Sequence, residues 1–139
     1  MDDIGALNRK FNDDPVHAMA PFDKNRCGTV PGEGGACLIV ESLESAKKRG
    51  SKIYGEIVGY HSNNEAYHLS NPSPDGIGIM KCMLAAVKEA GIKNNEIDVV
   101  HTHATSTPAG DGSEANALKI FLGSDYEKVL KLSPYDFVK

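Results

Sequence analysis

Two histidines and a run of hydroxyl-bearing residues stand together in the segment HTHATSTPAGDGSE (His101–Glu114). An imidazole can give or accept a proton near neutral pH, so a fixed histidine can assist a reaction that moves a proton or builds negative charge. Serine and threonine hydroxyls can bind an amide-bearing ligand, or they can satisfy the backbone of their own turn. The segment therefore combines residue types suited to acid–base chemistry with residue types that close a loop.

His103 is the strongest single candidate for chemistry. It follows an apolar run that we expect to be a strand, and ligands of open α/β sheets gather beyond the carboxyl ends of strands. The alternative is a structural histidine bonded to its own loop, which spacing alone slightly favours. His101 and His103 could share a metal ion, but no HxxxH pair or nearby cysteine supplies a third ligand. We therefore expect no metal site.

Two further motifs are better explained by structure than by chemistry. Ser106 lacks the GxSxG context of a hydrolase nucleophile. The glycine-rich stretch Gly32–Gly35 lacks the following Lys-Ser/Thr of a phosphate-binding loop, and it precedes an expected strand instead of a helix. The three cysteines form no CxxC pair, so they indicate neither a zinc site nor a disulfide framework.

The elements that must position these residues follow from the hydrophobic pattern. The continuous apolar run Ala36–Val40 predicts a strand covered on both faces. Ser42 can cap a short helix over Leu43–Arg49, which Gly50 ends. Ile53–Tyr60 predicts a second strand.

Helical spacing then returns. An apolar stripe with spacings of three and four predicts a helix that Gly91 stops; its members are Ile77, Met80, Leu84 and Val87. A third strand is expected over Ile97–Thr102.

Asp111 and Glu114, three positions apart, resemble a capping box that opens a last helix. Gly123 ends this helix. The order β-α-β-α-β-α predicts the α/β fold class, with His103 just past the end of the third strand.

Composition limits the function classes. The chain has 139 residues, of which 40% are hydrophobic and 24% charged, and its net charge is −4. These values fit one soluble domain and give no electrostatic support to nonspecific nucleic-acid binding. No apolar run approaches the roughly 20 residues that span a bilayer, and the acidic N-terminus lacks the layout of a signal peptide. We therefore expect an intracellular protein without membrane insertion.

Taken together, these segments resemble the β-ketoacyl-acyl carrier protein synthases, the elongating condensing enzymes of the thiolase superfamily. The resemblance covers roughly Ile4–Gly123. Polyketide synthase ketosynthase domains share much of the same pattern. The residues that carry it are PFDKNRCGTVPGEGGACLIVESLESAKKRG (Pro21–Gly50), IYGEIVGY (Ile53–Tyr60), AYHLSNPSPDG (Ala66–Gly76) and HATSTPAGDGSE (His103–Glu114).

The resemblance implies part of a five-layer thiolase-like fold with two similar α/β halves. About residues 1–60 would end the first half and about residues 61–139 would begin the second. The implied reaction is a decarboxylative Claisen condensation of malonyl-acyl carrier protein with an acyl thioester. The substrates are carried on the phosphopantetheine of acyl carrier protein, and no separate cofactor is implied. The intact enzyme would be a homodimer in the bacterial cytoplasm, the mitochondrion or the plastid.

The resemblance also implies residue roles. His103 matches the first histidine of the family's HGTSTP motif, which donates a hydrogen bond to the malonyl thioester oxygen. Thr105 and Thr107 match the threonines that bind the pantetheine arm. Asp111 and Glu114 match acids that help to hold an active-site lysine. Ala104 stands where the family has glycine, so a positive φ there would cost about 1 kcal/mol.

Two parts of the family's catalytic set have no match. None of Cys27, Cys37 and Cys82 stands in the context of the family's nucleophile, at the start of a helix upstream of the PFD segment. No segment resembles the one that carries the lysine and the second histidine. We therefore expect the chain alone to be inactive in condensation. Two alternatives stay open: a noncatalytic module that binds carrier protein, pantetheine or a condensing enzyme, and a metal-dependent activity through His101 and His103.

Overall fold

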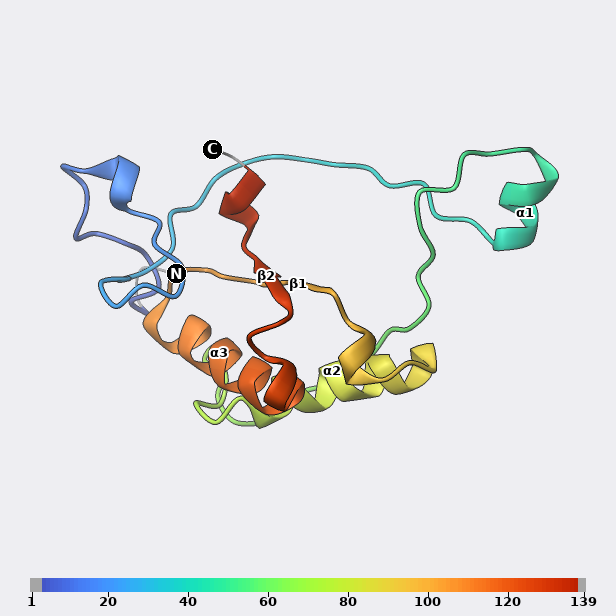
Figure 1. The fold of residues 1–139 in the computed structure, drawn as a ribbon. Helices are drawn as coiled ribbons and strands as arrows, with labels where there is room; N and C mark the ends of the chain where they lie inside the picture. The colour runs from blue at the N-terminus through green and yellow to red at the C-terminus, as the bar shows by residue number, and fades with distance from the viewer. Residues whose placement is uncertain (1–3, 138–139) are drawn as a thin grey trace.

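Two packed helices and a two-stranded parallel sheet form the body of the molecule, and a long arm leaves this body and returns to it (Figure 1). The computed structural model describes residues 4–137. Its helices are α1 (Leu43–Lys48), α2 (Ile77–Ala90) and α3 (Pro108–Leu122), and its strands are β1 (Val99–His101) and β2 (Leu130–Leu132). Short 3-10 turns span Pro15–His17, Asn94–Glu96, Gly123–Asp125 and Pro134–Phe137.

The sheet is a single β-α-β unit. β1 and β2 pair in parallel, with Val99 opposite Leu130 and His101 opposite Leu132, and α3 makes the crossover that parallel strands require. Both the backbone amide and the hydroxyl of Thr102 donate to the carbonyl of Leu132, at 2.8 and 2.9 Å. The pairing therefore extends one residue past β1 and fixes where the following loop begins.

The apolar core lies between α2, α3 and the sheet. Phe121, Leu122 and Val129 are buried at its centre, and partly buried side chains of α2 and β1 pack against them, namely Met80, Met83, Val87 and Val100 among others. The predicted stripe on α2 is confirmed for Met80 and Val87, whereas Leu84 is 40% exposed.

The predicted helix ends are confirmed where the signal is local. The Ser42 hydroxyl accepts a hydrogen bond from the amide of Ser45 at 3.2 Å and caps α1. α2 stops at Gly91, which adopts a φ of 70° that favours glycine.

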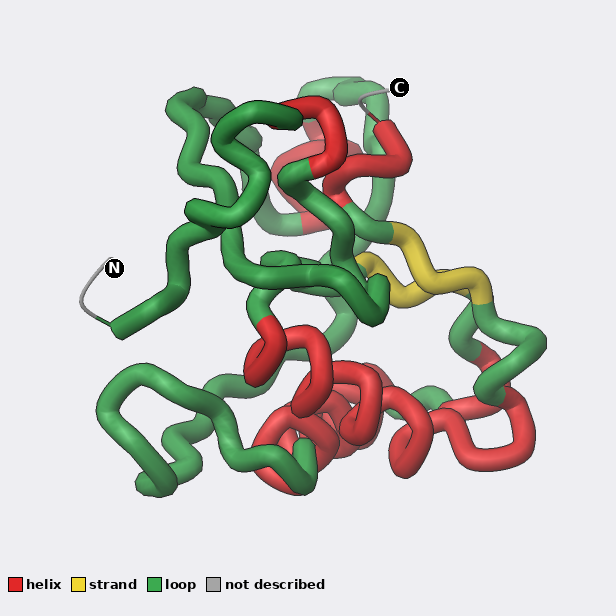
Figure 2. Tube along the Cα trace, turned by 90° about the vertical axis from the view of Figure 1, so that its left-hand side faces the viewer, coloured by secondary structure: helices red, strands yellow, loops and turns green. Residues whose placement is uncertain are grey.

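The prediction of strands at Ala36–Val40 and Ile53–Tyr60 is wrong. Ala36–Val40 and Ile53–Tyr60 run extended along the two sides of the arm (residues 31–62), which carries α1 away from the body (Figure 1). In Figure 2 the tube is yellow only where β1 and β2 pair. A strand exists only when a neighbour completes its hydrogen-bond ladder, and neither segment has one among residues 4–137. Their side chains remain open to solvent, with exposed fractions of 87% for Leu38 and 77% for Ile57.

Among the helices that the structure describes, none is both long enough and apolar enough to pass through a bilayer.

Gly76 and Gly91 flank α2 with the same φ of 70°, which makes them a matched pair. A Cβ at Gly76 would lie 2.5 Å from both the amide nitrogen of Ala117 and the carbonyl oxygen of Ser113, whereas a Cβ at Gly91 would meet open space. We predict that Gly91→Ala lowers the free energy of unfolding by about 1 kcal/mol. Gly76→Ala should cost at least ~2 kcal/mol more, because it also separates α2 from α3.

Urea unfolding of the two variants measures this difference. Equal losses would contradict the close approach of α2 and α3 at Gly76.

Candidate active site

The hydroxyl-rich loop lies between the end of β1 and the first turn of α3. Thr107 is the N-cap of α3: its hydroxyl accepts a hydrogen bond from the Gly110 amide at 3.1 Å, and Pro108 follows at the first helical position. The predicted capping box of Asp111 and Glu114 is therefore wrong, because both acids lie inside α3. The Thr-Pro pair was the signal that marked the true start.

Glu114 uses its carboxylate to hold the backbone at His103. Its Oε1 accepts from the amide of His103 at 2.8 Å, and its Oε2 accepts from the amide of Ala104 at 3.0 Å. Ala104 is 1% exposed and has a φ of 47°. The left-handed backbone costs an alanine about 1 kcal/mol, and two charge-assisted hydrogen bonds oppose that cost.

Asp111 holds the next part of the loop in the same way. The residue is 1% exposed. Its Oδ1 accepts from the amide of Ser106 at 3.0 Å, and its Oδ2 accepts from the amide of Phe22 at 2.7 Å. Ser106 and Phe22 both have positive φ, at 64° and 61°. One buried carboxylate therefore joins the loop before α3 to a segment far upstream in the chain.

The two threonines predicted to bind pantetheine lie side by side. Their hydroxyl oxygens are 3.0 Å apart. A Cβ at Gly110 would come within 2.4 Å of the Thr107 hydroxyl and 3.1 Å of the Thr105 hydroxyl. Glycine at this position therefore leaves the space that the pair of hydroxyls occupies.

His103 has a fixed backbone but an exposed side chain. His101 at the end of β1 is exposed as well. Within residues 4–137, no group of three or more histidine, cysteine or acidic side chains is arranged to hold a metal ion. Beside the loop is a hollow of about 330 Å³, lined by Met19, Pro21, Phe22, Thr102, Lys131, Ser133 and Asp136.

None of the three cysteines occupies the position of an activated nucleophile. Such a thiol needs a helix N-terminus or a cation beside it. Cys27 lies half-buried in a loop, Cys37 is exposed in the arm, and Cys82 lies inside α2, where its thiol donates to the carbonyl of His61 at 3.3 Å.

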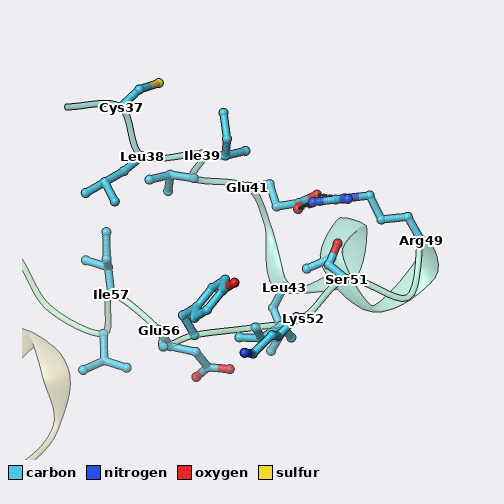
Figure 3. A pocket seen from close by; sticks show the side chains of 16 residues that line it. Cys37, Leu38, Ile39, Glu41, Leu43, Arg49, Ser51, Lys52, Glu56 and Ile57 are labelled. Atoms are coloured by element: carbon cyan, nitrogen blue, oxygen red, sulfur yellow. Dashed lines mark hydrogen bonds and ion pairs between the residues drawn. The ribbon is translucent and has the colours of Figure 1, made fainter. Parts of the chain in front are cut away.

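The larger hollow of the molecule lies in the arm, away from His103. It measures about 670 Å³, and Leu38 and Ile57 face each other across it (Figure 3). At its rim the Arg49 guanidinium binds the carboxylate of Glu41, which lowers the pKa of Glu41 and raises the pKa of Arg49. Apolar side chains make up most of the lining of this hollow, and Glu56 and Lys52 are among the charged side chains that also line it.

Comparison with known proteins decides the family. Residues 54–134 match the family model described as beta-ketoacyl synthase, C-terminal domain. The chain belongs to the beta-ketoacyl synthase family.

Relatives agree with this family. The chain is 50% identical over 113 residues to 3-oxoacyl-[acyl-carrier-protein] synthase 2 of Synechocystis, a match that covers 81% of this chain and 27% of the relative. A ketosynthase solved in complex with its type II polyketide synthase acyl-carrier protein superposes with a TM-score of 0.90 at 37% identity, over 94% of this chain and 32% of the other. A beta-ketoacyl synthase from Burkholderia phymatum gives a TM-score of 0.88 at 35% identity, over 96% and 31% of the two chains.

The resemblance inferred from the sequence is therefore confirmed, and the fold is part of the α/β ketosynthase fold. The chain spans about a quarter to a third of the length of these relatives. The superposition includes 94% of this chain, so it must include most of the arm. The extended course of the arm therefore belongs to the ketosynthase fold. The roles of His103, Thr105 and Thr107 toward a substrate stay predictions.

Sequence reasoning missed the long-range contacts of Ser106 and Arg26. The Ser106 hydroxyl accepts from the amide of Ala20 at 3.1 Å, and the Arg26 guanidinium reaches the carbonyl of Thr107 at 3.3 Å. The partners in these pairs are 86 and 81 positions apart, so no local spacing could have indicated them.

Glu114→Gln tests the support of the His103 backbone. A glutamine side chain offers one oxygen, so one of the two amides would face an NH₂ group instead of an acceptor. We predict a loss of about 1–3 kcal/mol in the free energy of unfolding, as expected for a hydrogen bond to a charged group. Glu127→Gln, at an exposed position, is the control and should change it by less than about 0.5 kcal/mol. A similar small effect of both variants would contradict the assignment.

Proposed function

We propose that this chain supplies the first histidine and the pantetheine-binding threonines of a β-ketoacyl-acyl carrier protein synthase. The observation that carries the proposal is the Glu114 carboxylate, which fixes the backbone of His103 directly after β1. The 50% identity to a 3-oxoacyl-acyl carrier protein synthase supports the same reaction class. The intact enzyme is an acyltransferase of fatty acid elongation.

His103 acts on the malonyl half-reaction. The bond between the malonyl α-carbon and its carboxylate breaks, carbon dioxide leaves, and the electron pair moves into the thioester as an enolate. An N–H of the His103 ring donates to the enolate oxygen while this charge develops. The α-carbon then attacks the acyl thioester and a new carbon–carbon bond forms. The thiolate that carried the acyl group leaves.

Thr105 and Thr107 bind the arm that carries the malonyl group. Their hydroxyls lie 3.0 Å apart at the start of α3, within the same loop as His103. Amide groups of a phosphopantetheine can donate to and accept from such hydroxyls. A thioester at the end of that arm is thereby presented to the ring of His103. The partner that delivers it is acyl carrier protein.

The remaining catalytic groups come from outside this chain in our proposal. A donor to an enolate works best where water is excluded, and His103 is exposed among the described residues. None of the three cysteines has the surroundings of a nucleophile. The chain alone is therefore inactive in condensation. The complete enzyme is a homodimer of the bacterial cytoplasm, the mitochondrion or the plastid.

His103→Ala tests the proposed role in a chimera, in which the 113 matched residues of the Synechocystis synthase are replaced by those of this chain. We predict that the chimera releases carbon dioxide from malonyl-acyl carrier protein, and that His103→Ala slows this release by about 10²–10³-fold, as for loss of one donor to a developing anion. His61→Ala, an exposed histidine outside the loop, is the control and should leave the rate unchanged.

A His103→Ala chimera that retains the parent rate within twofold would contradict the proposal. Condensation by the 139-residue chain alone would contradict the prediction that this chain is inactive without the rest of the enzyme.

The exposed arm supports the same placement within a larger enzyme. Leu38 and Ile39 are 87% and 82% exposed, which is unusual for adjacent large apolar side chains. Leu38→Asp should change the free energy of unfolding of the 139-residue chain by less than about 0.5 kcal/mol, since the side chain is already in solvent. In the chimera the same variant should prevent accumulation of folded protein, because other parts of the synthase cover that position. Size-exclusion chromatography of both proteins measures the contrast, and an equally folded chimera would contradict it.

A further inference from the structure

We propose that Arg26 is a positioning residue for the His103 loop. Its guanidinium donates from Nε to the carbonyl of Thr107 at 3.3 Å and from Nη2 to the carbonyl of Pro108 at 2.9 Å. A third donor, Nη1, binds the carbonyl of Asp23 at 3.0 Å. The first two bonds tie the Asp23–Arg26 turn to Thr107, which caps α3, and to Pro108, and the third lies within the turn itself. The inference rests on the proposed function, because the loop it positions is the one assigned to substrate.

The positive charge of Arg26 lies at the N-terminus of α3, which is unusual for a cation. A cation at the start of a helix faces the positive end of the helix dipole, which disfavours it. The carboxylate of Asp111 compensates: its Oδ2 lies 3.8 Å from the Arg26 Nε, and the Asp111 side chain is only 1% exposed. A buried carboxylate without a cation is strongly unfavourable. Arg26 is the cation that the structure provides to Asp111, and the Arg26 side chain is itself only 22% exposed.

The same carboxylate organises two strained residues. Ser106 and Phe22 both donate their amides to Asp111 while holding a positive φ. Such conformations persist only when several contacts determine them together. Ser106 is fully buried, and its carbonyl also accepts from the amide of Gly28 at 2.9 Å, two residues beyond Arg26.

Arg26 does not itself contact the reacting atoms. It acts through Asp111 on Ser106, which lies between the two threonines, and through the Thr107 carbonyl on the start of α3. Loss of the guanidinium leaves the charge of Asp111 unpaired and releases the Ser106 turn. Thr105, Thr107 and His103 then lose their mutual placement, and the reaction slows although each side chain is still present.

Arg26→Gln and Arg26→Lys test the inference on the 139-residue chain and on the chimera. In the chain, hydrogen exchange should accelerate at least tenfold at the amides of Ser106 and Phe22 in Arg26→Gln. In the chimera, Arg26→Gln should lower kcat for malonyl decarboxylation about tenfold. Arg26→Lys keeps the charge but not the planar fork, so it should restore part of the rate. The double variant Arg26→Gln/Asp111→Asn should lower kcat by less than the product of the two single effects, because no unpaired buried charge remains.

Arg49→Gln and Arg49→Lys are the matched controls, since Arg49 also pairs with a carboxylate but lies in the arm. Both should leave exchange at Ser106 and Phe22 unchanged. Exchange and kcat of Arg26→Gln within twofold of the Arg49→Gln values would overturn the inference. If Arg26→Gln does not fold, Arg26→Lys decides: exchange at the two amides at least threefold faster than in Arg49→Lys supports the inference, and equal exchange overturns it. Exchange needs no turnover, so an inactive chimera with accelerated exchange contradicts the proposed function alone.

Discussion

The candidate site depends on two carboxylates of α3 that accept hydrogen bonds from backbone amides. Glu114 takes the amides of His103 and Ala104, and Asp111 takes those of Ser106 and Phe22. Ala104 and Ser106 in this loop, and Phe22 far upstream, all have positive φ and would otherwise relax into more favourable backbone regions. Both acids belong to the first two turns of one helix. The packing of α3 against α2 and the sheet therefore fixes where the loop lies.

This arrangement separates the residues that support the loop from those to which we assign chemistry. The acids act on the backbone and leave His103 exposed, whereas the hydroxyls of Thr105 and Thr107 bond to each other and that of Thr107 also caps α3. A histidine held by its main chain keeps its position at the end of β1 even though its ring is exposed. In the proposed reaction a donor aimed at developing charge must not reorganise, and a loop whose amides at His103, Ala104 and Ser106 are held by carboxylates meets that requirement. The missing feature is cover from water, which fits a chain that spans a quarter to a third of its relatives.

Local signals predicted part of the fold, and contacts across the chain decided the rest. The Ser42 cap and the stops of α1 and α2 at glycine depend on neighbouring residues, so the sequence predicted them. The strands at Ala36–Val40 and Ile53–Tyr60 failed because strands need partners, and residues 4–137 offer them none. The spacing of Asp111 and Glu114 predicts a capping box, and this prediction fails because Thr107 already caps the helix. Arg26 had no local signal at all.

Native-state hydrogen exchange of the unmodified chain measures whether Asp111 and Glu114 hold the loop before α3. The four amides of Phe22, His103, Ala104 and Ser106 report whether the two carboxylates hold the loop. We predict that they exchange as slowly as amides in the inner turns of α3. Exchange as fast as that of Leu38 in the exposed arm would contradict it.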